Sequence, residues 1–352
     1  MTRRHSIASN SAMNLGGFAV PLVVGLIAVP IITRELGAAR FGLLSLAFAI
    51  LEYSNLFDLG LGAATTREVS ASLARKDDRL SQLIAGSVAS QAALGLIGTV
   101  ILFLASPLLV DHLFVIPPEL RNEAVGVFRV LALMIPPTIV LLSLRGVLEA
   151  AQRFDLSNAI RAPGSVATFL IPAVAASFGF GLPAIVMMLL IARILVCTAM
   201  GIAVGKVLPG LSWKVRMDWS TMRPLFVFGG WMSVSNIVGP LLVYLDRFML
   251  GALVGVAAVG YYTAPFDGVM RLLIIPASLM GAVYPTVSGM LAVGNHDSIH
   301  RMYAQSLQKT MLLLVVPAAL LGIAGPTLLR LWLGSTFASE GAVAIRILAF
   351  GV

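Results

Sequence analysis

Charged residues interrupt long apolar stretches of this sequence, and their types suggest two kinds of chemistry. Three are acids, namely Glu52, Asp58 and Asp267. Five are arginines in the middle or near one end of such a stretch, namely Arg34, Arg129, Arg193, Arg247 and Arg271. Guanidinium groups bind phosphate through two parallel hydrogen bonds, and a carboxyl group in apolar surroundings can take up and release a proton. We therefore predict substrate-anion binding by the arginines and ion coupling by the acids.

The two acids nearest the N-terminus have a regular spacing. Glu52, Asn55 and Asp58 recur every three residues, which would place them on one face of a continuous helix. No basic residue stands within one helical turn of Glu52, so its carboxyl group is expected to be desolvated and suited to coupling. A glutamate that serves only packing and hydrogen bonding is the open alternative.

The other acid has a basic neighbour in sequence. Asp267 and Arg271 are four residues apart with the acid first, which is the favourable order for an ion pair on one helix. For this pair and for Arg193, structural salt bridges are an alternative to substrate binding.

Motifs of enzymes and metal proteins are missing or incomplete. His296 and His300 stand one helical turn apart, but the glutamate of a zinc-protease motif does not lie between them. Cys197 is the only cysteine, which excludes an intramolecular disulfide and a cysteine-rich metal site. We predict no catalytic residue, no metal site and no cofactor, which disfavours a membrane transferase.

Composition indicates the environment in which these residues act. The chain has 352 residues, of which 59% are hydrophobic and 11% are charged. Soluble domains carry roughly 25% charged residues, so neither a soluble globule nor a disordered chain fits. The sequence predicts an all-α membrane protein with many spans, in which an unpaired charge at mid-bilayer costs at least ~2.5 kcal/mol.

Nine stretches are long and apolar enough to cross a bilayer as helices. They are 15–33, 41–62, 83–105, 124–144, 162–180, 182–204, 225–245, 261–283 and 307–329. A tenth opens at Gly341 and stops at Val352, and its twelve residues would cover only about 18 Å as a helix. We therefore expect the chain to end inside a span.

The basic residues predict the orientation. Fifteen of the 24 Lys and Arg, including all four lysines, fall on one side if the N-terminus is cytoplasmic. Cytoplasmic loops carry such an excess, so a cytoplasmic N-terminus is predicted. The net charge of +8 is explained by topology, and nucleic acid is not an expected partner.

An internal repeat predicts two lobes. A shift of 214 residues aligns Gly25 with Gly239 and Leu36–Ala38 with Leu250–Ala252, although chance matching in a glycine-rich chain is an alternative. Six spans separate the copies, so the repeats would be parallel. The predicted domains are an N-terminal lobe at 1–206, a cytoplasmic linker at 207–224 and an incomplete C-terminal lobe at 225–352.

Several segments resemble one family. Pro30–Leu43 and Asp58–Val69 look like the opening of the polysaccharide-unit (Wzx-type) flippases of the multidrug/oligosaccharidyl-lipid/polysaccharide (MOP) exporter superfamily. Phe228–Trp231, Leu245–Arg247 and Val259–Pro265 resemble the start of that family's second lobe.

The resemblance implies a function, partners and a location. It implies a flippase that moves O-antigen or exopolysaccharide units on an undecaprenyl-pyrophosphate-type lipid by alternating access through a cationic cavity between the lobes. The expected partners are that lipid-linked oligosaccharide, membrane lipids and the polysaccharide polymerase machinery. The expected location is the bacterial cytoplasmic (inner) membrane. A cation-coupled multidrug exporter of the same superfamily is the alternative, which the embedded arginines disfavour because they balance the acids.

Overall fold

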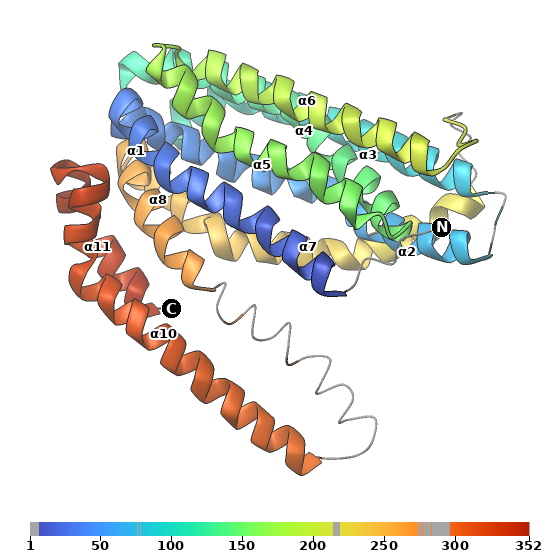
Figure 1. Ribbon diagram of the computed structural model, residues 1–352. Coiled ribbons are helices and arrows are strands. Elements are labelled where there is room, and N and C mark those ends of the chain that lie inside the picture. The colour runs from blue at the N-terminus through green and yellow to red at the C-terminus, as the bar shows by residue number, and fades with distance from the viewer. Residues whose placement is uncertain are drawn as a thin grey trace. The chain divides into compact units, whose positions relative to one another are not determined.

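The computed structural model describes residues 7–75, 77, 79–213, 219–273, 276, 283 and 296–351. Within these residues every regular element is helical (Figure 1). The α-helices are α1 (Ile7–Tyr53), α2 (Leu61–Arg75), α3 (Leu80–Leu108), α4 (Arg121–Ala150), α5 (Phe154–Ser177), α6 (Leu182–Val207), α7 (Trp219–Leu253), α8 (Val256–Met270), α10 (His296–Leu333) and α11 (Ser335–Gly351). Short 3-10 or π turns are Ser54–Asp58, Leu109–Leu113, Pro118–Leu120 and Arg271–Leu273.

Six segments of the described chain are long and apolar enough to cross a membrane. They are Val23–Asp58, Leu80–Leu113, Pro118–Ala150, Phe154–Ser177, Leu182–Val207 and Met302–Leu333. The predicted class, an all-α polytopic membrane protein, is confirmed. The predicted span at 225–245 lies within α7. Helix α8 contains the first part of the span predicted at 261–283, and most of the later residues of that span lie outside the described residues.

The first helix is two helices joined at a glycine. Gly37 leaves helical geometry with φ 75° and ψ 169°, values that a residue without a Cβ adopts freely. Figure 1 shows the chain reversing direction along α1. This break separates the stretches predicted at 15–33 and 41–62.

A continuous helix over 41–62 was predicted, and that prediction is wrong. Helix α1 ends at Tyr53, a 3-10 turn follows, and Leu59 (φ 47°) and Gly60 (φ 69°) are left-handed before α2 begins at Leu61. The break lies against α7, because a Cβ on Gly60 would come within 2.4 Å of the Gly229 carbonyl oxygen. Close backbone approach to α7 therefore accompanies the interruption.

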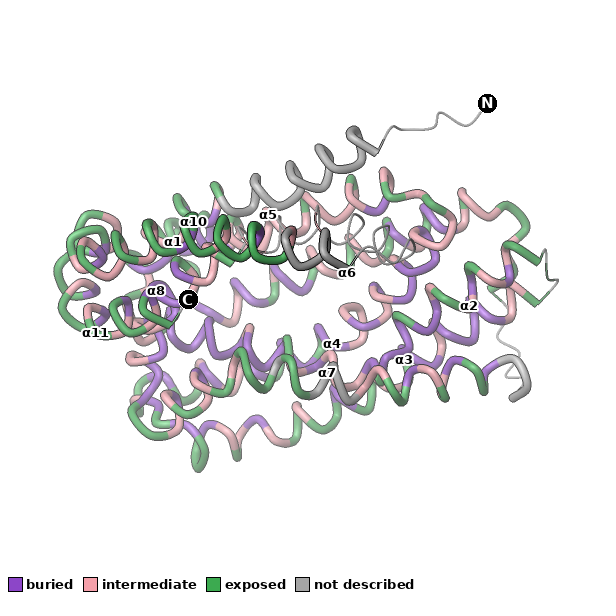
Figure 2. Tube along the Cα trace, turned by 90° about the horizontal axis from the view of Figure 1, so that it is seen from below, coloured by how far each residue is buried: buried purple, intermediate pink, exposed green. Residues whose placement is uncertain are grey.

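Contacts divide the chain into two compact units, Met1–Val256 and Ala257–Val352. In the first unit α4 contacts α2, α3 and α6, while α5 contacts α1 and α6. The buried side chains of its core include Leu61, Ala64, Leu144, Val147, Met200 and Met222. Figure 2 shows buried positions recurring along α3 and α4. Helix α7 also packs on α2, and the domain boundary predicted at 207–224 stays a prediction.

The second unit contains α8, α10 and α11, with Val269, Leu329 and Ile345 in its core. Its last helix begins at Ser335, earlier than the Gly341 predicted, because Gly334 with φ 95° ends α10 and the next residue already starts α11. The helix therefore has 17 residues rather than the twelve expected.

Candidate functional site

A buried carboxylate lies at the break between α1 and α2. Asp58 is 3% exposed and accepts a hydrogen bond from the Gly62 N–H at 3.0 Å. The Gln91 side-chain amide of α3, itself fully buried, also donates to Asp58. A carboxylate that accepts N–H bonds at the start of a helix stabilises that end. Asp58 therefore holds the first turn of α2 against α3.

Three buried hydroxyl groups continue this polar contact along α2, α3 and α4. The Ser87 and Ser143 oxygens are 2.8 Å apart, and the Thr65 oxygen is 3.2 Å from Ser143 and also bonded to Ser87. Sequence reasoning missed this network. Its signal was the polar pair Ser87 and Gln91, four residues apart and hence on one face of an otherwise apolar helix.

Glu52 of α1 and Arg193 of α6 carry opposite charges, and they are called the Glu52–Arg193 pair below. The Glu52 carboxylate accepts a hydrogen bond from the Asn55 amide at 3.3 Å and is exposed, whereas Arg193 is half-buried. The two charges lie within electrostatic range of each other. The prediction that Glu52 has no basic neighbour holds only along its own helix, because the cation comes from a helix distant in sequence.

The shared face predicted for Glu52, Asn55 and Asp58 is therefore only partly correct. Glu52 and Asn55 contact each other, but Asp58 turns away and is buried against Gln91. The end of α1 at Tyr53 is the reason, since Asp58 ends the 3-10 turn that follows and accepts its hydrogen bond from the first turn of α2.

The remaining predicted arginines of the first unit lie on three helices. Arg34 is exposed on α1. Arg129 of α4 lies over the Phe103 ring with its guanidinium carbon 5.1 Å from the ring centroid. Arg247 of α7 is 6% exposed and lies 5.4 Å from the Tyr244 centroid. Both are cation–π geometries.

Asp267 and Arg271 belong to the second unit. Helix α8 ends at Met270, so Arg271 begins a 3-10 turn instead of continuing the helix that carries Asp267. Their ion pair stays a prediction.

One end of α4 carries a charged cluster that the sequence did not suggest. Arg40 Nε of α1 is 2.9 Å from Glu123 Oε2, and Glu123 Oε1 accepts the Leu182 N–H at 2.9 Å. This group of three residues, called the Glu123 cluster below, joins the ends of α1, α4 and α6. Both oxygens of the Glu123 carboxylate therefore have a hydrogen-bond donor.

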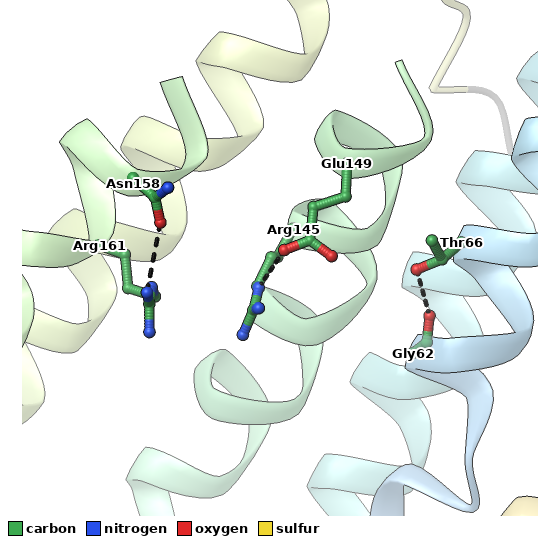
Figure 3. Close-up of polar contacts among 6 residues, drawn as sticks. All are labelled: Gly62, Thr66, Arg145, Glu149, Asn158 and Arg161. Carbon is green, nitrogen blue, oxygen red and sulfur yellow. Dashed lines mark hydrogen bonds and ion pairs between the residues drawn. The ribbon is translucent and has the colours of Figure 1, made fainter. Parts of the chain in front are cut away.

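The other end of α4 carries a second cluster (Figure 3). Arg145 Nε is 2.6 Å from Glu149 Oε1, and Arg161 of α5 donates to Asn158 Oδ1 at 3.3 Å. Arg161 lies within electrostatic range of both Arg145 and Glu149. These four residues are called the Arg145 cluster. Arg145 and Arg161 are two of the fifteen basic residues that predict the orientation, and no other role was predicted for them.

Small residues set the helix spacing beside this cluster. A Cβ on Gly146 would lie 2.4 Å from Thr66 Oγ1, and the Thr66 hydroxyl donates to the Gly62 carbonyl at 3.1 Å. Helices α2 and α4 therefore approach closely next to Arg145, as membrane helices do at small residues (Figure 3).

An ion pair near this cluster, but not part of it, is formed by Arg153 and Asp155. Arg153, between α4 and α5, makes two 2.9 Å hydrogen bonds to the two oxygens of Asp155. The hydrogen bonds to this carboxylate raise the pKa of the Arg153 guanidinium above its ordinary value.

Comparison with solved structures shows the fold. An inward-facing multidrug resistance MATE family transporter of the MOP superfamily superposes with a TM-score of 0.72 at 14% identity, covering 95% of this chain and 81% of that one. A MOP superfamily transporter from Pyrococcus furiosus gives a TM-score of 0.62 at 14% identity, covering 94% and 75%.

Comparison of sequences shows the family. The model of the family described as "Polysaccharide biosynthesis protein" matches residues 7–291. A Shigella flexneri protein named "Putative O-antigen transporter" is 28% identical, covering 98% of this chain and 81% of that protein. The Bacillus subtilis membrane protein EpsK is 22% identical, covering 94% and 66%. The resemblance inferred from the sequence is confirmed, and with it a transporter rather than an enzyme: the chain belongs to the polysaccharide biosynthesis protein family, with the fold of MOP superfamily transporters.

Proposed function

We propose that this protein moves lipid-linked oligosaccharide units from the inner to the outer leaflet of the bacterial cytoplasmic membrane, for surface polysaccharide synthesis. The proposed carrier lipid is of the undecaprenyl-pyrophosphate type. Family membership and the likeness to the O-antigen transporter of Shigella flexneri support this cargo. The physical problem is to take a polar, anionic head group through hydrocarbon, where each unsatisfied polar group costs several kcal/mol.

The charged pair Glu52–Arg193 is the observation that carries the proposal. Arg193 lies eleven residues from the start of the 26-residue helix α6, which is mid-span, and an acid on another helix accompanies it. A pair between two helices can separate, so that the guanidinium group meets a phosphate instead. A stretch that only needs to cross lipid has no use for such a pair.

Transport is proposed to proceed by alternating access through a cationic cavity between two lobes, 1–206 and 225–352. Its proposed lining arginines are Arg34, Arg129, Arg193, Arg247 and Arg271. The proposed coupling acids are Glu52, Asp58 and Asp267. Protonation of Glu52 would leave Arg193 without its counter-charge and strengthen the hold on an anion. Ionisation of Glu52 would restore the pair and favour release.

The N-terminus is proposed to be cytoplasmic, and the polysaccharide polymerase machinery is a proposed partner on the outer side. A reporter enzyme fused after Lys206 should read cytoplasmic, and one fused after Glu119 should read external. The opposite pattern would reverse the direction of every step above.

The experiment that tests the function is complementation of a bacterium that lacks its own O-unit flippase. Expression of this protein should restore surface polysaccharide, and Arg193→Ala should abolish it while membrane insertion is unchanged. Arg193→Lys should rescue only partly, because an ammonium group lacks the planar fork of guanidinium. Lys206→Ala, which removes one charge from the same helix near its end, is the matched control and should behave as wild type.

Two results would contradict the proposal. One is full polysaccharide export by Arg193→Ala. The other is resistance of the cells to cationic drugs without restored polysaccharide, which would favour the multidrug exporter.

A further inference from the structure

The Arg145 cluster places two guanidinium groups near each other on different helices. Arg145 comes from α4 and Arg161 from α5, and each lies in the field of the other. In Figure 3 both side chains extend the same way, with Glu149 and Asn158 nearer the α4–α5 connection. Like charges at short range repel unless an anion lies with them. An anion that lies between both guanidinium groups would therefore be stabilised by each of them.

One carboxylate belongs to the cluster, and it is held weakly. Glu149 stands four residues after Arg145, and the two side chains are 25% and 42% exposed. Half-exposed pairs of this kind contribute only about 0.3–0.5 kcal/mol, so Glu149 can leave Arg145 at little cost. Asn158 accepts a hydrogen bond from Arg161 Nη2 and so orients that guanidinium group. Glu149 is thus a carboxylate that a stronger anion can replace, and an anion in its place would lie in range of both guanidinium groups.

The depth of the two arginines suits a lipid head group. Arg145 lies five residues before the end of α4, which is about 8 Å, and Arg161 lies seven residues after the start of α5, which is about 10 Å. The head-group region on each side of a bilayer's hydrocarbon core has a similar thickness. A lipid that is still in its own leaflet would present its anionic head group at this level.

We propose that Arg145 and Arg161 form a capture site for the diphosphate of a lipid carrier, which displaces Glu149 from Arg145. A diphosphate ester carries more than one negative charge and many acceptor oxygens, so it can engage both guanidinium groups at once. This site precedes the mid-span Arg193 on the transport path. The identity of the lipid rests on the proposed function, but binding of a diphosphate lipid does not.

Binding is measured with the purified full-length protein in nanodiscs of neutral lipid, and three probes are compared. Farnesyl diphosphate presents the lipid diphosphate, farnesyl monophosphate removes one phosphate, and inorganic pyrophosphate removes the lipid. The expected order of affinity is diphosphate lipid first, with both others at least ~10-fold weaker. Equal affinity for inorganic pyrophosphate would overturn the assignment to a lipid head group.

Single substitutions in and beside the Arg145 cluster distinguish an effect on binding from an effect on the fold. Arg145→Ala and Arg161→Ala should each weaken farnesyl diphosphate binding at least ~10-fold, since each removes charge-assisted hydrogen bonds. Glu149→Gln should tighten binding about threefold, because the competing carboxylate is gone. Arg153→Ala removes the same charge at the same end of α4 and should leave the affinity unchanged. Wild-type affinity in both arginine variants, or weaker binding in Glu149→Gln, would overturn the proposal.

Failure of this site and failure of the proposed function give different results. If wild type exports polysaccharide but Arg145→Ala and Arg161→Ala bind farnesyl diphosphate normally, the capture site is wrong and the function stands. If wild type binds the diphosphate through these arginines but restores no polysaccharide, the site stands and the proposed cargo is wrong.

Discussion

Helix α4 has a charged cluster at each end, and the two clusters use arginine differently. In the Glu123 cluster, one carboxylate receives the Arg40 guanidinium on one oxygen and the Leu182 N–H on the other. In the Arg145 cluster, two guanidinium groups lie in range of one carboxylate. The first arrangement pairs one positive charge with one negative charge and joins three helices. In the second, the carboxylate pairs with a residue of its own helix while a guanidinium group of another helix lies in range.

The difference separates a structural role from a binding role. Glu123 is only 15% exposed, so removal of its carboxylate strands an N–H group at the start of α6. Arg145 is 42% exposed and its partner is a neighbour on the same helix, so little of the fold depends on the pair. A charge count at each helix end thus predicts which residues should affect folding and which should affect transport.

The largest expected effect comes from the helix contact beside the Arg145 cluster. Gly146→Ala should lower the free energy of unfolding by about 3 kcal/mol, because its Cβ would lie 2.4 Å from Thr66 Oγ1. Thr66→Ala in the same chain should recover most of the loss, since the obstructing oxygen is gone. Denaturant unfolding in detergent measures both, and a double variant no more stable than Gly146→Ala would mean that the α2–α4 spacing is not set here.

The next effect breaks the Glu123 cluster. Glu123→Ala should lower the free energy of unfolding by about 2 kcal/mol, the cost of an unsatisfied polar group. Arg40→Ala should cost less than about 1 kcal/mol, because the Arg40 side chain is 45% exposed and Glu123 keeps its bond from Leu182. Equal losses in the two variants would mean that the ion pair, not the N–H group, holds this end together.

A smaller effect is expected between the two clusters. Ser143→Ala should cost about 1 kcal/mol, because the fully buried Ser87 loses one hydroxyl partner but keeps Thr65. Hydrogen exchange at the α3–α4 contact would report local opening. Unchanged exchange together with unchanged stability would show that the hydroxyl network adds nothing to the packing of α3 on α4.

The smallest effect on folding is expected at Glu149. Glu149→Gln should change the free energy of unfolding by less than about 0.5 kcal/mol, as for other exposed pairs four residues apart. Glu123→Gln, the same substitution at the other end of α4, should cost clearly more. If the two substitutions destabilise equally, the distinction between the clusters fails.

The sequence predicted the helices well and their interruptions poorly. The apolar lengths of stretches such as 83–105 and 182–204 require helices, and α3 and α6 contain them. The break after Asp58 depends on a leucine with positive φ and on the approach of Gly229, which no local pattern reveals.

Pairings between distant residues account for most of what the sequence missed at the site. Arg193 was predicted from its depth alone, but its electrostatic interaction with Glu52 depends on how helices distant in sequence are arranged. Arg40 and Glu123 are 83 residues apart, and both looked like ordinary charges at helix ends. Arg145 and Arg161 were attributed to membrane orientation, because charges near a helix end satisfy that rule whether or not they also bind an anion.

The measurement that tests the account most directly compares Arg161→Ala with Glu123→Ala in one set of experiments. Polysaccharide export in complemented cells and the free energy of unfolding of the purified protein are determined for both variants, with export corrected for the amount of protein in the membrane. Arg161→Ala is expected to lose most export at unchanged stability, whereas Glu123→Ala should lose stability and keep its corrected export. Normal export by Arg161→Ala, or a loss of stability equal to that of Glu123→Ala, would contradict this expectation.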